Sequence, residues 1–97
     1  MSEVVKIMVG DLENTAAPAK QFRGREAKAL ADLIERGGQG LSSIEHIGPR
    51  LSHYILKLRR AGLDIATVDE THAGPFHGSH GRYYLRSRVE VLAEVRA

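Results

Sequence analysis

Residues 49–65, PRLSHYILKLRRAGLDI, combine a helical hydrophobic period with the start of a strand. Within this segment, apolar side chains recur with the i, i+3, i+4, i+7 spacing of one helix face, at Leu51, Tyr54, Ile55 and Leu58. Pro49 suits the first helical position, where its missing N–H is not needed, and Gly62 suits the end. The spacing therefore predicts a helix over about 49–61.

Beyond Gly62 the period changes to two. Leu63, Ile65 and Thr67 alternate with their neighbours, which predicts a strand over 63–70. The segment THAGPFHGSHG, residues 71–81, is rich in turn-forming glycine, and residues 82–86 read as a second strand. The two strands would form a hairpin.

Upstream of residue 49 the pattern is again helical. The helix spacing predicts a helix over 23–36, ended by the glycines at 37–38. Ser42 or Ser43 can cap a brief second helix that runs to about His46. The sequence thus predicts three helices followed by a hairpin.

The two ends of the chain add smaller elements. Residues 3–9 are β-prone and predict a strand, while residues 10–22 read as a linker or an extended wrap. Ser87 with Glu90 resembles a capping box, which predicts a short C-terminal helix carrying Leu92 and Val95. We divide the chain into an N-terminal strand and linker, 1–22, and a main domain, 23–97.

Composition narrows the class of protein. A chain of 97 residues with 42% hydrophobic residues is the size of one globular domain. It has no cysteine, which excludes disulfides and thiolate metal sites, and no apolar run of transmembrane length. We expect a soluble, cytoplasmic protein.

The formal net charge is only +2, but the positive charge is concentrated in two segments. Residues 46–63 contain Arg50, Lys57, Arg59 and Arg60 and no acid, and residues 71–89 contain three arginines and no acid. An ordinary solvated face mixes both signs. The distribution therefore favours an anionic partner.

The expected helix at 49–61 presents its polar face to that partner. With its apolar residues pointing inward, the opposite side carries a set of donors suited to the DNA major groove, namely Arg50, Ser52, His53, Lys57 and Arg60. Arg82 and Arg86, together with Arg88, would contact phosphates or a minor groove from the hairpin. Double-stranded DNA is the expected partner.

Other chemistries lack a matching pattern. His72, His77 and His80 do not have the spacing of a zinc site, so no metal is expected. There is no cysteine nucleophile and no Gly-x-Ser-x-Gly elbow, and the GGQG segment lacks the strand-to-helix context of a phosphate loop. We expect no enzyme activity, no cofactor and no small-molecule ligand.

Residues 23–88 resemble small bacterial winged-helix proteins, many of them encoded by phages or prophages. The resemblance is carried by AKALADLIERG, by PRLSHYILKLRRAGLDI and by GRYYLRS at the second hairpin strand. It implies an α+β winged helix-turn-helix fold, with a three-helix core and a two-stranded β-wing. It also implies DNA binding, and we expect a regulator of transcription or of phage-derived genes.

Two other classes of function remain open. Winged helices also serve as protein–protein modules, and the strand EVVKIMV at residues 3–9 could pair with a second copy or with a partner's sheet edge. Exposure of Leu56 would favour such a protein contact. RNA binding lacks a stacking motif beyond Tyr83–Tyr84. A homodimer is expected on the DNA hypothesis, since one short helix reads few base pairs.

Overall fold

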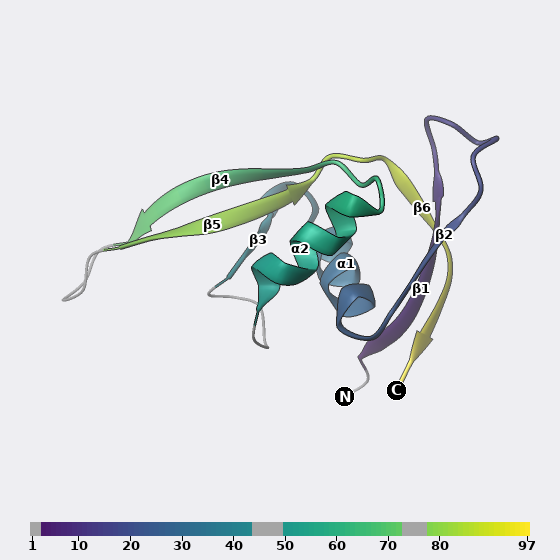
Figure 1. Ribbon diagram of the computed structural model, residues 1–97, viewed down its shortest axis with the longest axis horizontal. Helices are drawn as coiled ribbons and strands as arrows, with labels where there is room; N and C mark the ends of the chain where they lie inside the picture. Colours follow the sequence, from purple (N-terminus) through teal and green to yellow (C-terminus); the bar gives the residue numbers. More distant parts are fainter. Residues whose placement is uncertain (1–2, 44–49, 73–77) are drawn as a thin grey trace.

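The computed structural model of the chain describes residues 3–43, 50–72 and 78–97. These residues form two three-stranded sheets with α-helices packed between them (Figure 1), and the principal extents are 49 × 30 × 20 Å. The elements in chain order are β1 (Val4–Asp11), β2 (Lys20–Arg23), α1 (Gly24–Arg36), a 3₁₀ turn η1 (Gly37–Gln39), β3 (Leu41–Ser42), α2 (Leu51–Arg60), β4 (Ile65–His72), β5 (Gly78–Leu85) and β6 (Val89–Arg96).

The strand predicted at 3–9 is confirmed as β1, and it lies in the middle of the first sheet. That sheet has the order β2-β1-β6, with both neighbours antiparallel to β1. Residues 20–22 of the expected linker belong to β2. Because both edges of β1 are occupied, this strand is not free to pair with a second copy or a partner.

The prediction of a C-terminal helix is wrong, since residues 89–96 form β6. The hydroxyl of Ser87, expected to cap that helix, instead accepts a hydrogen bond from the Asp64 backbone N–H at 2.8 Å. β1 offers backbone partners along almost the whole segment, with Asp11 opposite Val89 and Val4 opposite Arg96. An isolated helix of this length is only marginally stable in water, so pairing with β1 prevails.

The helix predicted at 23–36 is confirmed as α1. Ala27, Leu30 and Leu33 lie on its buried face, as the spacing indicated. Gly37 ends the helix with φ 51°, a left-handed conformation that glycine adopts without a Cβ penalty, and its N–H donates to the Leu33 carbonyl.

The helix predicted at 49–61 is confirmed as α2, but it begins at Leu51 rather than at Pro49. Most of the expected second helix, with the turn after it, falls in residues 44–49, outside the described part. Ser42, one of its two expected caps, is a buried strand residue of β3. The described residues therefore contain two α-helices and do not establish a three-helix core.

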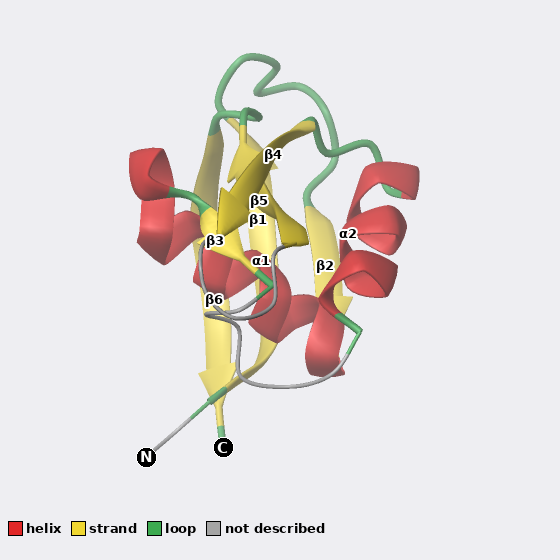
Figure 2. Ribbon diagram, turned by 90° about the vertical axis from the view of Figure 1, so that its left-hand side faces the viewer, coloured by secondary structure: helices red, strands yellow, loops and turns green. Residues whose placement is uncertain are grey.

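The predicted hairpin is confirmed, and it is longer than expected. β4 and β5 pair from Ile65 opposite Leu85 out to His72 opposite Gly78, so much of the expected turn belongs to the ladder. β3 joins β5 on its other side, giving the order β3-β5-β4. Figure 1 shows the hairpin extending away from the helices, and in Figure 2 it points toward the viewer with α2 on one side.

One hydrophobic core joins these elements. β1 and β2 contribute four of its side chains, and the others come from α1, from α2, from the loop before β4 and from the first residues of β3 and β4. Its buried members are Val4, Ile7, Val9, Phe22, Ala27, Ala29, Leu30, Leu33, Leu41, Leu51, Ile55, Leu58, Leu63 and Ile65. No helix in the described ranges is long and apolar enough to cross a membrane.

Candidate nucleic-acid interface

The exposed face of α2 lies opposite the side chains that this helix buries in the core. Leu51, Ile55 and Leu58 are buried against the core. Ser52, Leu56 and Arg60, spaced four residues apart, form the exposed ridge on the opposite side. The candidate recognition surface is therefore partly apolar, because Leu56 is 44% exposed at the middle of this ridge.

Arg50 precedes α2 in a strained conformation. Its φ of 65° and ψ of 37° are left-handed, and it is the only non-glycine residue with positive φ among those described. Such a conformation costs on the order of 1–3 kcal/mol and is often kept at functional sites. The Arg50 carbonyl accepts from the backbone N–H of His53 at 3.0 Å, so the strained residue also starts the helix. Its side chain is exposed beside the first turn.

The other predicted residues of α2 differ in how available they are. Ser52 and Arg60 are exposed, and within the described ranges neither makes a side-chain hydrogen bond or ion pair. His53 is half-buried, with its ring edge-on to Tyr54 at a centroid distance of 5.3 Å.

Lys57 forms an ion pair with a residue of α1. Its Nζ lies 3.2 Å from Oε1 of Glu26, and both side chains are substantially exposed. An ion pair this exposed contributes about 0–1 kcal/mol, so a phosphate can replace the carboxylate at small cost. Lys57 remains able to contact DNA, in competition with Glu26.

Arg59 has a structural role that the sequence analysis did not identify. Its guanidinium donates to the Ile65 carbonyl, at 2.6 Å from Nη2, and to the Thr67 hydroxyl at 2.6 Å. These bonds tie the end of α2 to the first residues of β4. The sequence places Arg59 on the flank of the helix, but its partners are visible only in the fold.

Arg82, predicted as a wing contact, is held within the protein. Its Nε donates to Oε1 of Glu70 across the hairpin at 2.9 Å, and its Nη1 donates to the Gln39 carbonyl at 3.2 Å. Its side chain is only 19% exposed. The structure thus uses Arg82 to fasten the hairpin to the segment after α1.

Arg86, the other predicted wing residue, is exposed just beyond β5. It lines a cleft of about 240 Å³ at the base of the hairpin together with Lys20 and Arg88. Asp11, Glu13 and Asp64 line the same cleft, so its charges are mixed. Lys20 was missed because it lies in the expected linker, and only its pairing opposite Val9 brings it here.

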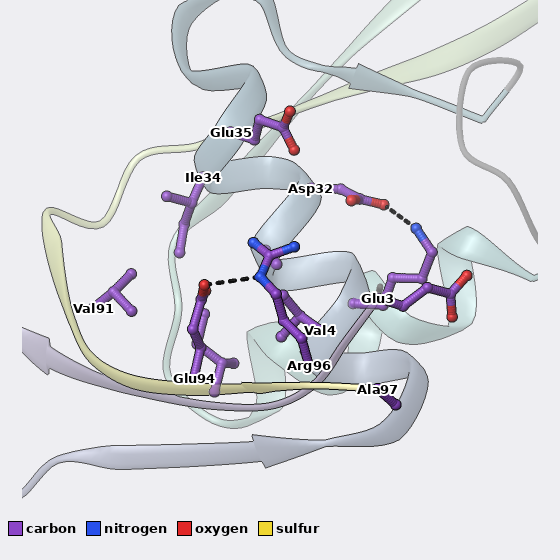
Figure 3. Close-up of a pocket in the computed structure, with 12 residues that line it drawn as sticks. Glu3, Val4, Asp32, Ile34, Glu35, Val91, Glu94, Arg96 and Ala97 are labelled. Atoms are coloured by element: carbon purple, nitrogen blue, oxygen red, sulfur yellow. Dashed lines mark hydrogen bonds and ion pairs between the residues drawn. The ribbon is translucent and has the colours of Figure 1, made fainter. Parts of the chain in front are cut away.

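A larger groove lies between α1 and β6 and has a different character. Its volume is about 820 Å³, and Figure 3 shows charged side chains around apolar ones such as Ile34 and Val91. Four acids line it, Glu3, Asp32, Glu35 and Glu94, against the two bases Lys28 and Arg96. This balance repels a polyanion, so the groove is not part of the candidate DNA surface.

His77 lies outside the described residues, and so do the side chains of His72 and His80. Among the residues that are described, no group of three His, Cys, Asp or Glu side chains is placed to hold a metal ion.

Comparison with known proteins bears on the whole arrangement. No curated protein and no solved structure matches the chain. A family model described as a winged helix domain matches residues 19–95, which include both helices, the β4–β5 hairpin and most of β6. Because the match spans most of the chain, this protein belongs to the winged helix domain family.

Proposed function

We propose that this winged-helix protein is a non-enzymatic module that binds double-stranded DNA and acts in transcription regulation. The observation that carries the proposal is the charge of α2. From Arg50 to Leu63 every ionic side chain is basic, and Arg50 and Arg60 are exposed with no ion-pair partner in the described ranges. The hairpin that extends beside α2 supplies the wing of this arrangement.

The position of each basic or polar side chain on α2 and the hairpin determines which part of the DNA it would contact. Arg50, Ser52 and His53 lie at the start of α2, which in winged helices enters the major groove, and they would contact base edges. Lys57 and Arg60, farther along, would contact phosphates. Arg86 and Arg88 at the hairpin base would contact the backbone, while Arg82 keeps the hairpin in place.

Fluorescence polarisation with random-sequence duplex DNA, at two salt concentrations, tests the proposal. The variant Arg50→Ala/Arg60→Ala removes the two unpaired cations of α2. Since Arg60 is the one of the two assigned to a phosphate, the magnitude of the slope of log K against log salt should fall by roughly 1, and affinity should fall at each salt concentration. Unchanged binding by this variant would contradict the proposed surface.

A matched control removes the same charge elsewhere. Lys6 and Arg23 lie opposite each other in the β1–β2 pair, on the sheet face away from the core residues Ile7 and Phe22. The Lys6→Ala/Arg23→Ala variant should bind DNA like the unaltered chain. An equal loss of affinity in the two double variants would show that only net charge matters.

A second function, docking of a protein on α2, is favoured by one observation, the exposure of Leu56. An apolar side chain at the middle of the ridge suits a protein groove, although it can also contact a thymine methyl group in DNA. Absence of DNA binding even at low salt would support the protein-docking function.

A further inference from the structure

The groove between α1 and β6 is a second surface, separate from the exposed face of α2. Its volume is about 820 Å³, and none of its described lining residues belongs to α2 or to the β4–β5 hairpin. Along β6 it extends from Val91 to Arg96, a length of about 17 Å at the rise of an extended strand. The groove can therefore be occupied independently of the proposed DNA surface.

The middle of the groove is apolar. Ala31 and Ile34 of α1 and Val91 of β6 line it, together with the buried Val4 and Ile7. Val91 is 40% exposed, and Ala31 and Ile34 are only partly buried. Apolar side chains left open in a groove of this size favour contact with apolar side chains of another molecule.

The two bases of the groove are each paired with an acid of the same element. Nζ of Lys28 lies 3.0 Å from Oδ2 of Asp32, one turn farther along α1. Nε of Arg96 donates to Oε1 of Glu94 at 3.0 Å. These two pairs neutralise both of the cations that the groove contains.

Two further carboxylates, those of Glu3 and Glu35, are exposed at the groove without a cation. Neither side chain forms an ion pair or a hydrogen bond with any residue in the described ranges. In Figure 3 Glu35 lies beside Ile34, whereas Glu3 lies near Ala97, to which its backbone is hydrogen-bonded. Carboxylates at separate positions around an apolar centre favour a ligand that carries positive charges on either side of apolar groups.

We propose that this groove binds a basic, amphipathic segment of a partner protein. Apolar side chains of the segment would contact Ile34 and Val91, and Lys or Arg side chains would pair with Glu3 and Glu35. An apolar centre with a polar rim is the usual arrangement of a protein-binding surface. A nucleic acid is repelled by the carboxylates, and a polyamine lacks the apolar side chains. Together with the proposed DNA binding, the groove would give the chain two separate binding faces.

Fluorescence polarisation with three labelled synthetic peptides, in the absence of DNA, tests the proposal on the unaltered chain. Each peptide has about twelve residues, which span the groove even as a helix of about 18 Å. One contains Leu and Lys, one Leu and Glu, and one Ser and Lys. The Leu/Lys peptide should bind, and the other two should bind at least about tenfold more weakly. Absence of binding by the Leu/Lys peptide, or tighter binding of the Leu/Glu peptide, would overturn the proposal.

Removal of the two free carboxylates tests the charges of the groove. Glu3→Gln/Glu35→Gln should weaken binding of the Leu/Lys peptide by roughly fivefold. Glu13 and Glu90 are likewise exposed and unpaired within the described ranges, but they lie outside the groove. The control Glu13→Gln/Glu90→Gln should bind like the unaltered chain. An equal loss in both variants would show that the peptide responds only to net charge, and the proposal would fail.

Two valines of β6 test the apolar contact. Val91 pairs with Val9 on the core side, whereas Val95 pairs with Lys6 on the outer face of the sheet. Val91→Ser should weaken binding of the Leu/Lys peptide by roughly fivefold, and Val95→Ser should not change it. Equal affinities of the two variants would contradict the proposed contact. Self-association in sedimentation velocity that Val91→Ser abolishes would instead assign the groove to a second copy.

The variant Arg50→Ala/Arg60→Ala separates this proposal from the proposed DNA binding. Both residues lie outside the groove, so the variant should bind the Leu/Lys peptide no more weakly than the unaltered chain does. Loss of peptide binding in this variant would place the peptide on α2 and overturn the proposal for the groove.

Discussion

Replacement of Gly40 by alanine tests how the hairpin is seated on the helical core. Gly40 connects η1 to β3, and β3 pairs with β5 through Leu41 opposite Tyr83. Its backbone has φ 71° and ψ 170°, a region that is almost restricted to glycine. Its carbonyl also accepts a hydrogen bond from Nε of Arg36 at 2.8 Å.

The expected loss of stability has two parts. Holding alanine in this backbone conformation costs about 1–3 kcal/mol. A Cβ at Gly40 would lie 2.7 Å from Cε1 of Tyr84 and 2.9 Å from Cγ of Arg82, both nearer than real Cβ contacts. Relief of such overpacking costs about 1–3 kcal/mol more, partly because Arg82 is held by its bonds to Glu70 and Gln39. We therefore expect Gly40→Ala to lower the free energy of unfolding by about 2–6 kcal/mol.

Thermal and urea unfolding followed by circular dichroism measure this loss. At this chain size, about 2 kcal/mol lowers the melting temperature by at least about 8 °C. Two neighbouring glycines provide controls, since a Cβ at either meets nothing within 4 Å. Gly37 has φ 51°, so Gly37→Ala reports backbone strain alone. Gly38 does not have positive φ, so Gly38→Ala should change stability by less than about 0.5 kcal/mol.

The order of stability should therefore be Gly38→Ala, then Gly37→Ala, then Gly40→Ala as the least stable. If Gly40→Ala is no less stable than Gly37→Ala, the close approach of Tyr84 and Arg82 does not constrain the fold. If it matches Gly38→Ala, the argument from backbone strain fails as well.

Three further predictions concern α2. Arg59→Ala should lower the free energy of unfolding by about 1–2 kcal/mol in urea, because it removes the bonds to β4; an unchanged midpoint would make those bonds incidental. Glu26→Gln should raise DNA affinity up to about fivefold at low salt by freeing Lys57, and the gain should vanish in a Lys57→Ala background; a gain that persists there would have another origin. Leu56→Arg should strengthen duplex binding severalfold by adding a cation to the ridge, and unchanged affinity in polarisation titrations would place this ridge away from DNA.

The two predicted helices and the hairpin were recognisable because each depends on local periodicity. Leu51, Ile55 and Leu58 are buried as their spacing indicated, and Gly37 ends α1 as its sequence position indicated. Such patterns can be recognised within about ten to fifteen consecutive residues, and they do not depend on contact with a distant segment of the chain. The positive charge of α2 and the exposure of Arg50, Ser52 and Arg60 followed from the same reasoning.

The side-chain partners of the candidate site were not accessible in this way. Lys57 forms an ion pair with Glu26, and Arg82 bonds to Glu70 and to the Gln39 carbonyl. Glu26 and Gln39 lie far from these cations in sequence, whereas Glu70 lies in the neighbouring strand of the hairpin. Periodicity shows which face of an element a side chain lies on, but not which neighbouring element faces it. The sequence therefore indicated which residues are cationic and outward, while the fold decided which of them are free.

By itself the sequence determined the elements with a strong local period, the basic character of α2 and the membership of the winged helix domain family. Only the tertiary structure decided the form of residues 89–96. Val89, Val91, Leu92 and Val95 fit a short helix or a strand, and the choice depends on β1, some eighty residues earlier, offering an open edge. Backbone hydrogen bonding between segments so far apart leaves no local pattern, and it is this pairing that makes β6 the exposed edge of the sheet.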